Sequence, residues 1–223
     1  EDNNTYLEKT ENRFDLVDVR LHYNLYDASL KGADYDLTTI FEQTLVKNHP
    51  EHAVTFVENH DTQRGQALES TVEEWFKPSA YALILLRKDG LPCLFYGDYY
   101  GIDGEFAQES FKEVLDTLLY ARKDLAYGEQ TDYFDDPNCI GWTRSGNEDS
   151  TPLAVTIFER PAYAVHGSND AANNKSMEIG SDWAGQTFYD ILGNCSDTVT
   201  IDEDGWGDFP VSEKSVSVWT IQD

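Results

Sequence analysis

Short apolar runs alternate with longer mixed runs through the first 127 residues of the chain. Three runs have the length and continuous apolar character of buried strands, at residues 14–19, 53–57 and 93–96. Continuous apolar strands are typical of a parallel sheet that is covered on both faces. Between and after them, the segments predicted to be helical are 36–46, 70–89 and 109–128. The pattern therefore predicts three β/α units in series, which fits both a doubly wound sheet and a β/α barrel.

The predicted helix at residues 70–89 carries start and stop signals. Ser70 is a candidate N-cap with Glu73 three residues further on, and Gly90 follows the basic last turn. Pro78 falls about two turns inside this helix, where proline removes a backbone hydrogen bond and produces a kink. We therefore expect a kinked helix from Ser70 to the residue before Gly90.

The pattern changes after Gly128. Short strand candidates are separated by Gly, Asn, Asp and Ser turns, with no long helical pattern between them; they lie at residues 139–143, 153–158, 186–191, 197–201 and 215–220. Such a succession predicts an antiparallel β-sandwich. We thus predict two domains, at residues 1–127 and 128–223, with an α/β fold followed by an all-β fold.

Charge limits the classes of partner. The 223-residue chain has 42 acidic and 16 basic residues, and its formal net charge is −26. A charge of this sign and size repels nucleic-acid backbones and anionic membrane surfaces. No apolar run approaches the length of about 20 residues that spans a bilayer. We therefore expect no nucleic-acid partner and no membrane partner.

The cysteines and glycosylation sequons bear on the compartment. Cys93, Cys139 and Cys195 include no C-x-x-C pair, and their odd number argues against a disulfide framework or a zinc site. A bridge between Cys139 and Cys195 remains open. N-x-S/T sequons at Asn3, Asn174 and Asn194 favour an extracellular protein, and a cytoplasmic one remains possible.

A polar cluster follows the predicted strand at residues 53–57. It consists of Glu58, Asn59, His60 and Asp61. In parallel β/α folds, functional side chains lie beyond the carboxyl ends of the strands. The structural alternative is that these residues only close a turn or cap a helix.

Two segments identify a family resemblance. FVENHDTQ, residues 56–63, resembles the Phe-Val-Asp-Asn-His-Asp segment at the end of strand seven in the α-amylase family of glycoside hydrolases. GLPCLFYGDYYG, residues 90–101, resembles the segment that forms strand eight. Residues 20–29, 68–87 and 204–219 also resemble the liquefying type of α-amylase. The resemblance implies the last three β/α units of a (β/α)₈ TIM barrel, from strand six onward, followed by a Greek-key β-sandwich.

The resemblance implies hydrolysis of internal α-1,4-glucosidic bonds in starch with retention at the anomeric carbon. It assigns to Asp61 the third carboxylate of the site, which stabilises the transition state and helps to keep the acid/base protonated. It assigns to His60 hydrogen bonds to the same sugar. Gln63 is a further candidate for substrate contact, with an ordinary solvated loop residue as the alternative.

Glu58 is not expected to react. In an extended strand, side chains three residues apart point to opposite faces, so Glu58 and Asp61 could not act as a pair. We interpret Glu58 as a structural support of the loop. His22 could face the glucan or be packed, and Asp98 is expected to orient its neighbours or cap a helix.

The family nucleophile and acid/base follow strands four and five, so the resemblance implies that both lie upstream of Glu1. We therefore expect this chain to be inactive alone and to need the N-terminal half of the same enzyme. A rival hypothesis is a non-catalytic, glucan-binding or scaffold member of the fold.

The resemblance also implies Ca²⁺. The main calcium sites are expected upstream, and relatives hold a further ion between barrel and sandwich. The corresponding ligands here are the backbone carbonyls of Ala33 and Tyr35 together with the side chains of Asn138 and Glu159. Oxygen ligands suit Ca²⁺. Asn138 takes the place of an aspartate, however, so an ordinary turn is the alternative at this position.

Overall fold

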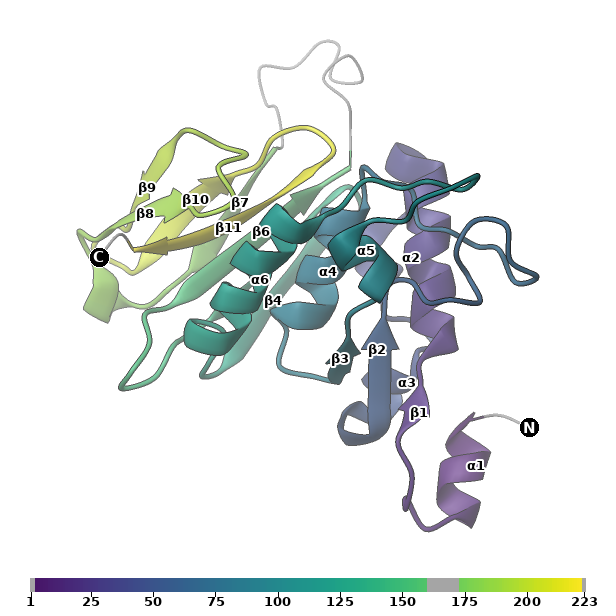
Figure 1. Ribbon diagram of the computed structural model, residues 1–223. Coiled ribbons are helices and arrows are strands. Elements are labelled where there is room, and N and C mark those ends of the chain that lie inside the picture. Colours follow the sequence, from purple (N-terminus) through teal and green to yellow (C-terminus); the bar gives the residue numbers. More distant parts are fainter. Residues whose placement is uncertain (1–2, 160–172, 222–223) are drawn as a thin grey trace. The chain divides into compact units, whose positions relative to one another are not determined.

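The computed structural model describes residues 3–159 and 173–221, in two compact units (Figure 1). The first unit combines the residues up to Leu30 with Thr39–Leu85 and Asp89–Leu115. The second combines Lys31–Thr38, Leu86–Lys88 and the chain from Asp116 onward. The domain boundary expected between residues 127 and 128 stays a prediction.

The first unit contains a three-stranded parallel sheet. The strands are β1 (Leu16–Val17), β2 (Ala53–Phe56) and β3 (Leu91–Cys93), in the order β1-β2-β3. Leu16 pairs with Ala53, and Val54 pairs with Leu91. Both pairings are parallel, as the apolar pattern of the strands predicts.

The first predicted strand is shorter than expected because a helix begins inside it. Helix α2 (Val19–Lys31) starts after Asp18, whose buried carboxylate accepts the backbone N–H groups of Leu21, at 3.0 Å, and of Val46, at 2.7 Å. The prediction of a strand over residues 14–19 was therefore wrong at its C-terminal end. The sequence analysis also missed α2 itself, although Leu21, Leu25 and Ala28 form its buried face.

The predicted helix at residues 36–46 was also wrong. This segment contains a 3₁₀ turn (Leu37–Thr39), and a short helix α3 (Leu45–Asn48) begins only at its end. Gln43 has a φ of 61°, which interrupts any continuous helix. The Thr44 side chain then caps α3 by accepting the N–H of Lys47 at 3.2 Å.

Helix α4 (Lys77–Leu85) begins seven residues later than Ser70. Pro78 therefore lies in the first turn, where its missing N–H costs no hydrogen bond, so the predicted kink was wrong. Ser70 does not cap the helix. Its hydroxyl lies 2.8 Å from His22 Nε2 and donates to the carbonyl of Leu68 at 2.9 Å. Eight of the nine residues of α4 are buried.

The last predicted strand and helix of this region occur in the expected order, but their boundaries differ from the predicted ones. Strand β3 ends at Cys93, and residues 96–100 form helix α5 (Tyr96–Tyr100), so the strand predicted at 93–96 was displaced by about two residues. Helix α6 (Lys112–Asp124) lies inside the predicted range 109–128 and buries Leu115 and Leu118.

The second unit is built mainly from antiparallel strands. The six-stranded sheet has the order β4-β5-β6-β11-β8-β9, and β7 pairs with β10. The strands are β4 (Gln130–Asp136), β5 (Cys139–Arg144), β6 (Leu153–Phe158), β7 (Asn174–Glu178), β8 (Thr187–Asp190), β9 (Thr198–Thr200), β10 (Trp206–Pro210) and β11 (Ser215–Ile221). The five predicted strands are all present, and β4, β7 and β10 were missed.

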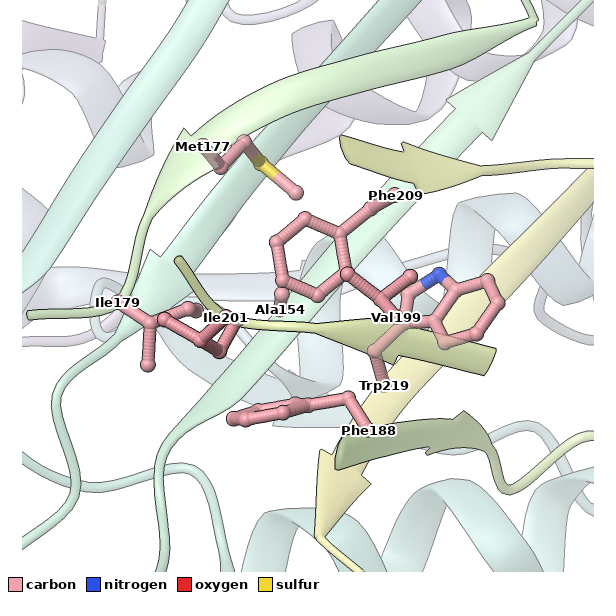
Figure 2. Packing of buried hydrophobic residues seen from close by; sticks show 8 residues of the cluster. All are labelled: Ala154, Met177, Ile179, Phe188, Val199, Ile201, Phe209 and Trp219. Carbon is pink, nitrogen blue, oxygen red and sulfur yellow. The ribbon is translucent and has the colours of Figure 1, made fainter. Parts of the chain in front are cut away.

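A compact apolar core lies between the strands of the second unit (Figure 2). Its residues come from both sheets and from the turns beside them: Ala154, Met177, Ile179, Phe188, Val199, Ile201, Phe209 and Trp219. The ring of Phe209 packs edge-on against Phe188 at 5.9 Å and against Trp219 at 6.0 Å. Burial of these large rings is the main stabilising contribution to the β unit.

Two further expectations concern cysteines and membranes. Cys93, Cys139 and Cys195 are free, so the bridge left open between Cys139 and Cys195 is not formed. The thiol of Cys139 instead lies 3.7 Å from the carbonyl oxygen of Asn174. Within residues 3–159 and 173–221, no helix has the length and apolar character needed to cross a membrane.

Candidate active site

The loop that follows β2 is a turn held by Asn59. The side-chain oxygen of Asn59 accepts the backbone N–H groups of Asp61, at 2.8 Å, and of Thr62, at 3.0 Å. Its backbone carbonyl accepts the N–H of Gln63 at 3.1 Å. Asn59 therefore closes a turn, which is the structural alternative considered for this cluster. The side chains of the next two residues, His60 and Asp61, remain available for contacts outside the turn.

His60 and Asp61 project from this turn side by side. Their side chains are 83% and 60% exposed, and His60 Nε2 lies 3.5 Å from Asp61 Oδ1. Gln63 lies next to them and donates through Nε2 to the backbone carbonyl of His60 at 3.4 Å. The three predicted substrate-facing residues thus belong to one loop at the carboxyl end of a parallel strand.

Glu58 lies beneath the same loop and is only 2% exposed. One carboxylate oxygen accepts the hydroxyl of Thr62, and the other accepts the N–H of Val72 at 3.2 Å. Burial raises the pKa of Glu58 to about 7, although the Thr62 hydroxyl and the ammonium of Lys77 act in the opposite direction. Glu58 therefore anchors the loop, as the sequence analysis expects, and does not share an exposed surface with Asp61.

A buried polar network that the sequence analysis missed lies next to Glu58. Lys77 is fully buried, and its ammonium group lies 3.9 Å from Glu58, donates to Asp98 and donates to Gln108 at 2.8 Å. Asp98 also accepts the hydroxyl of Tyr81 at 2.5 Å and the side-chain amide of Gln108 at 2.7 Å. Desolvation, followed by the charge of Asp98, raises the pKa of Tyr81 well above its ordinary value.

Asp98 was expected either to orient its neighbours or to cap a helix, and this network supports the orienting role. It joins the loop after β2 to α4 and α5 through charged groups that water does not reach. Removing one partner would leave an uncompensated buried charge, which is strongly unfavourable. A lysine within an otherwise apolar stretch, FKPSAYALIL, was the available sequence signal.

His22 is packed rather than exposed. Its Nδ1 lies 2.8 Å from the carbonyl of Val57, its Nε2 lies 2.8 Å from the hydroxyl of Ser70, and its ring stacks on Phe56 at 5.0 Å. Burial lowers the pKa of His22, against the Val57 hydrogen bond that raises it. His22 therefore supports the end of β2 from inside the unit.

The expected calcium ligands all lie in the second unit. Asn138 donates through Nδ2 to the carbonyl of Ala33 at 3.3 Å, and its own carbonyl accepts the N–H of Glu159 at 3.1 Å. Tyr35 follows in the same segment as Ala33 and donates its N–H to Gly32 at 2.8 Å. Hydrogen bonds thus link Asn138 to Ala33 and to Glu159, and the calcium site itself stays a prediction.

Glu159 is the distinctive member of this group. It is 0% exposed, and neither of its carboxylate oxygens has a hydrogen-bond partner among residues 3–159 and 173–221. Burial raises its pKa to about 9, against a smaller effect of Lys214. In the described part of the chain, no group of three or more His, Cys, Asp or Glu side chains is arranged so that it could hold a metal ion. A buried carboxylate is a ligand type that suits Ca²⁺, and the backbone of Glu159 is bonded to Asn138, another of the expected ligands.

Sequence comparisons agree with the motif resemblance. A family model described as "Alpha-amylase C-terminal" matches residues 164–220. A glucan 1,4-alpha-maltohexaosidase of Bacillus sp. (strain 707) is 50% identical over 214 residues, which cover 96% of this chain and 40% of the relative. An alpha-amylase of Geobacillus stearothermophilus is 49% identical over 216 residues, 96% of this chain and 37% of that protein. A cytoplasmic alpha-amylase of Escherichia coli (strain K12) is 43% identical over 228 residues, 98% of this chain and 44% of that protein.

Solved structures show the same fold at lower identity. An alpha-amylase I of Eisenia fetida, in a complex with maltohexaose, has a TM-score of 0.62 at 15% identity and covers 94% of this chain and 49% of its own. An alpha-amylase of Malbranchea cinnamomea has a TM-score of 0.60 at 14% identity, with coverages of 91% and 44%.

The chain spans about two fifths of the length of the relatives that it matches by sequence. Identities of 43–50% extend over nearly all of this chain, well beyond the two motifs at the ends of β2 and β3. These matches support the resemblance of the chain to the C-terminal region of the liquefying type of α-amylase, in family 13 of the glycoside hydrolases.

Proposed function

We propose that this chain forms part of an endo-acting α-amylase that hydrolyses internal α-1,4-glucosidic bonds of starch with retention. The observation that carries the proposal is the exposed pair of His60 and Asp61 at the carboxyl end of β2, held from below by buried Glu58. In this proposal, β1, β2 and β3 are strands six to eight of a (β/α)₈ barrel, and the second unit contains its Greek-key sandwich. The three parallel strands and the identity to named α-amylases support it.

Asp61 has the chemistry of a transition-state stabiliser. Its exposed carboxylate can accept hydrogen bonds from sugar hydroxyls and offset the positive charge that develops on an oxocarbenium-like ring. His60, within 3.5 Å of it, can donate to hydroxyls of the same sugar. Gln63 is placed for a further polar contact at the edge of this pair. None of the three breaks the glycosidic bond, because retention also needs a nucleophile and an acid/base about 5 Å apart.

The N-terminal half of the same enzyme is the proposed partner that supplies those two carboxylates. The parallel sheet of the first unit has two open edges, at β1 and β3, and open edges are normally covered or paired. Val17 in β1, Val19 just after it and Leu91 in β3 are exposed apolar residues at these edges. Starch and related α-1,4-glucans are the proposed substrates, and maltohexaose in the complex of the Eisenia fetida enzyme is consistent with this.

Calcium is the proposed bound ion of the second unit. Ala33 and Tyr35 would contribute backbone carbonyls, and Asn138 and Glu159 would contribute side-chain oxygens. The ion would neutralise a buried carboxylate whose oxygens accept no hydrogen bond from the described part of the chain. It would act structurally, by holding the segment around Ala33 to the ends of β5 and β6.

An extracellular location remains our proposal on the three sequons. The relatives do not decide it, because the Escherichia coli protein is named as cytoplasmic.

The decisive experiment is Asp61→Asn in the complete enzyme. We expect kcat on soluble starch to fall by at least about 10³-fold with an unchanged thermal midpoint, because the exposed carboxylate supports no contact that holds the fold. Asp149→Asn is the matched control, an exposed aspartate in the turn before β6, and should keep normal kcat. Near-normal kcat in Asp61→Asn would overturn the assigned role, whereas no hydrolysis by the unmodified complete enzyme would favour a glucan-binding protein.

A further inference from the structure

The segment between α5 and α6 contains a loop that is closed at its base. Ile102 and Gln108 exchange backbone hydrogen bonds, of 3.0 and 2.9 Å. The side chain of Gln108 reaches the buried network beside Glu58, where it donates to Asp98 at 2.7 Å and accepts from Lys77 at 2.8 Å. The base of the loop 102–108 is therefore fixed to the interior of the first unit.

Phe106 lies within this closed loop and is 47% exposed. Its ring packs against the backbone of Gly65, because a Cβ added at Gly65 would lie 2.4 Å from Cε2 and 2.6 Å from Cδ2 of the ring. The ring thus occupies the space that a side chain at position 65 would fill. A single exposed apolar residue needs no explanation by itself, so the position of this one has to carry the argument.

The position is next to the loop that presents His60 and Asp61. Gly65 follows Asp61 by four positions, and a segment of that length spans at most about 14 Å when fully extended. Here the segment is folded, since backbone hydrogen bonds of 3.1 and 3.3 Å close two successive turns between residues 59 and 66. Phe106 is therefore placed within a few sugar rings of the pair that the proposed function assigns to the glucan.

Both loops also belong to the same edge of the sheet. They follow β2 and β3, which are adjacent and parallel, so both lie on the side of the carboxyl ends of the strands. Loops on this side supply the substrate contacts of β/α barrels. Polar side chains come from the loop after β2, and the loop after α5 adds a flat apolar ring, which suits the apolar face of a sugar.

We propose that Phe106 stacks on a glucose ring farther along the same glucan than the ring held by His60 and Asp61, and thereby favours long glucans over short ones. The proposal rests on the proposed α-amylase function. Only a glucan that extends beyond the sugar at Asp61 reaches the aromatic ring, so the contact adds binding energy that depends on chain length. Phe106 takes no part in breaking the bond.

The alternative role is purely structural, in which the ring only holds the two loops together. Loss of such a contact would disturb the loop that carries Asp61 and would affect glucans of every length equally. The dependence on substrate length therefore separates the two roles.

The test is kcat/KM of the complete enzyme on maltooligosaccharides from maltotriose to maltoheptaose. Phe106→Ala should lower the ratio of kcat/KM for maltoheptaose to that for maltotriose at least about fivefold, mainly through KM for the long substrate. Phe106→Leu keeps an apolar contact with Gly65 but lacks the flat ring, so it should lower the ratio as well and serves if the alanine variant does not fold. Phe106→Tyr retains the ring and should keep the ratio within about twofold.

Phe14→Ala is the matched control. Phe14 is 51% exposed in the same unit, and it precedes the amino end of β1, away from the substrate loop. This variant should leave the ratio unchanged.

An unchanged ratio in Phe106→Ala and Phe106→Leu, or an equal loss for all lengths, would overturn the stacking role and leave the proposed function intact. No hydrolysis by the unmodified complete enzyme would instead overturn the proposed function. Calorimetric titration with maltoheptaose would then test Phe106 by itself, and equal affinities of the unmodified protein and Phe106→Leu would refute the contact.

Discussion

At the scale of single residues, two buried carboxylates have folded-state pKa values above their ordinary range. Burial is the main cause for both Glu58, at about 7, and Glu159, at about 9. Their surroundings differ, since Glu58 accepts two hydrogen bonds and Glu159 accepts none from the residues that the structure describes. A raised carboxyl pKa means that the folded state keeps a proton that the unfolded chain releases. Such a group reduces stability as the pH rises.

Glu159→Gln tests this directly. Because the unfolded pKa is 4.5 and the folded pKa about 9, the free energy of unfolding should fall between these pH values in the unmodified protein. Without calcium, the Gln variant should match it at pH 4 and be more stable by about 1–3 kcal/mol at pH 7.5. Denaturant unfolding at both pH values gives the difference.

Calcium should make the unmodified protein more stable than Glu159→Gln, the opposite of the order expected without calcium. Excess CaCl₂ at pH 7.5 should stabilise the unmodified protein and have little effect on Glu159→Gln, because the variant lacks the carboxylate that would hold the ion. Glu148→Gln, at an exposed position, is the control and should respond to calcium normally. Equal calcium responses of Glu159→Gln and unmodified protein would contradict the proposed ligand.

At the scale of elements, the turns between them constrain the chain through close backbone contacts. Gly128 joins α6 to β4 with a φ of 77°. A Cβ added there would lie 2.1 Å from the carbonyl oxygen of Gly146 and 2.3 Å from the hydroxyl of Ser145. The segment that follows β5 thus approaches Gly128 too closely for any side chain there.

Gly128→Ala should therefore lower the free energy of unfolding by at least about 2 kcal/mol, through left-handed strain plus a backbone clash. Gly185→Ala is a matched control, since Gly185 has a φ of 79° and no atom within 4 Å of the added Cβ. It should lose only about 1 kcal/mol. Equal losses, measured by chemical denaturation, would show that the contact with Gly146 does not matter.

At the scale of the whole molecule, the first unit contains the loop that exposes His60 and Asp61 and a small parallel sheet, whereas the second unit has a closed apolar core. The proposed enzyme needs its nucleophile and acid/base from a separate stretch of sequence. In this proposal, the same N-terminal half covers the exposed apolar residues at the sheet edges of the first unit and supplies the two missing active-site carboxylates.

The isolated 223-residue chain should consequently release no reducing ends from soluble starch. Co-expression with the N-terminal half of the same enzyme should restore hydrolysis, and Asp61→Asn within that complex should abolish most of it. A reducing-sugar assay measures all three. Turnover by the purified chain alone would contradict the proposed division of the site.

Strands were predicted correctly from the sequence where both of their faces are buried, because such strands are continuous apolar runs. Residues 53–57 and 153–158 are such runs and form β2 and β6. Strands β7 and β10, in which exposed and buried residues alternate, were not predicted. Helix α2 was also not predicted; the carboxylate of Asp18, which caps it, also accepts the N–H of the distant residue Val46. Local patterns carry no information on a partner 28 residues away.

The sequence by itself determined the family resemblance, the succession of α/β and β regions, and the loop that presents His60 and Asp61, because these depend on neighbouring residues and short motifs. Only the tertiary structure decided that Lys77 lies beside Glu58 and Asp98, that Glu159 is buried with no hydrogen-bond partner in the described ranges, and that the closed loop after α5 contacts the loop after β2. The physical reason is that desolvation and charge pairing depend on distances in space, and residues far apart in the chain set them.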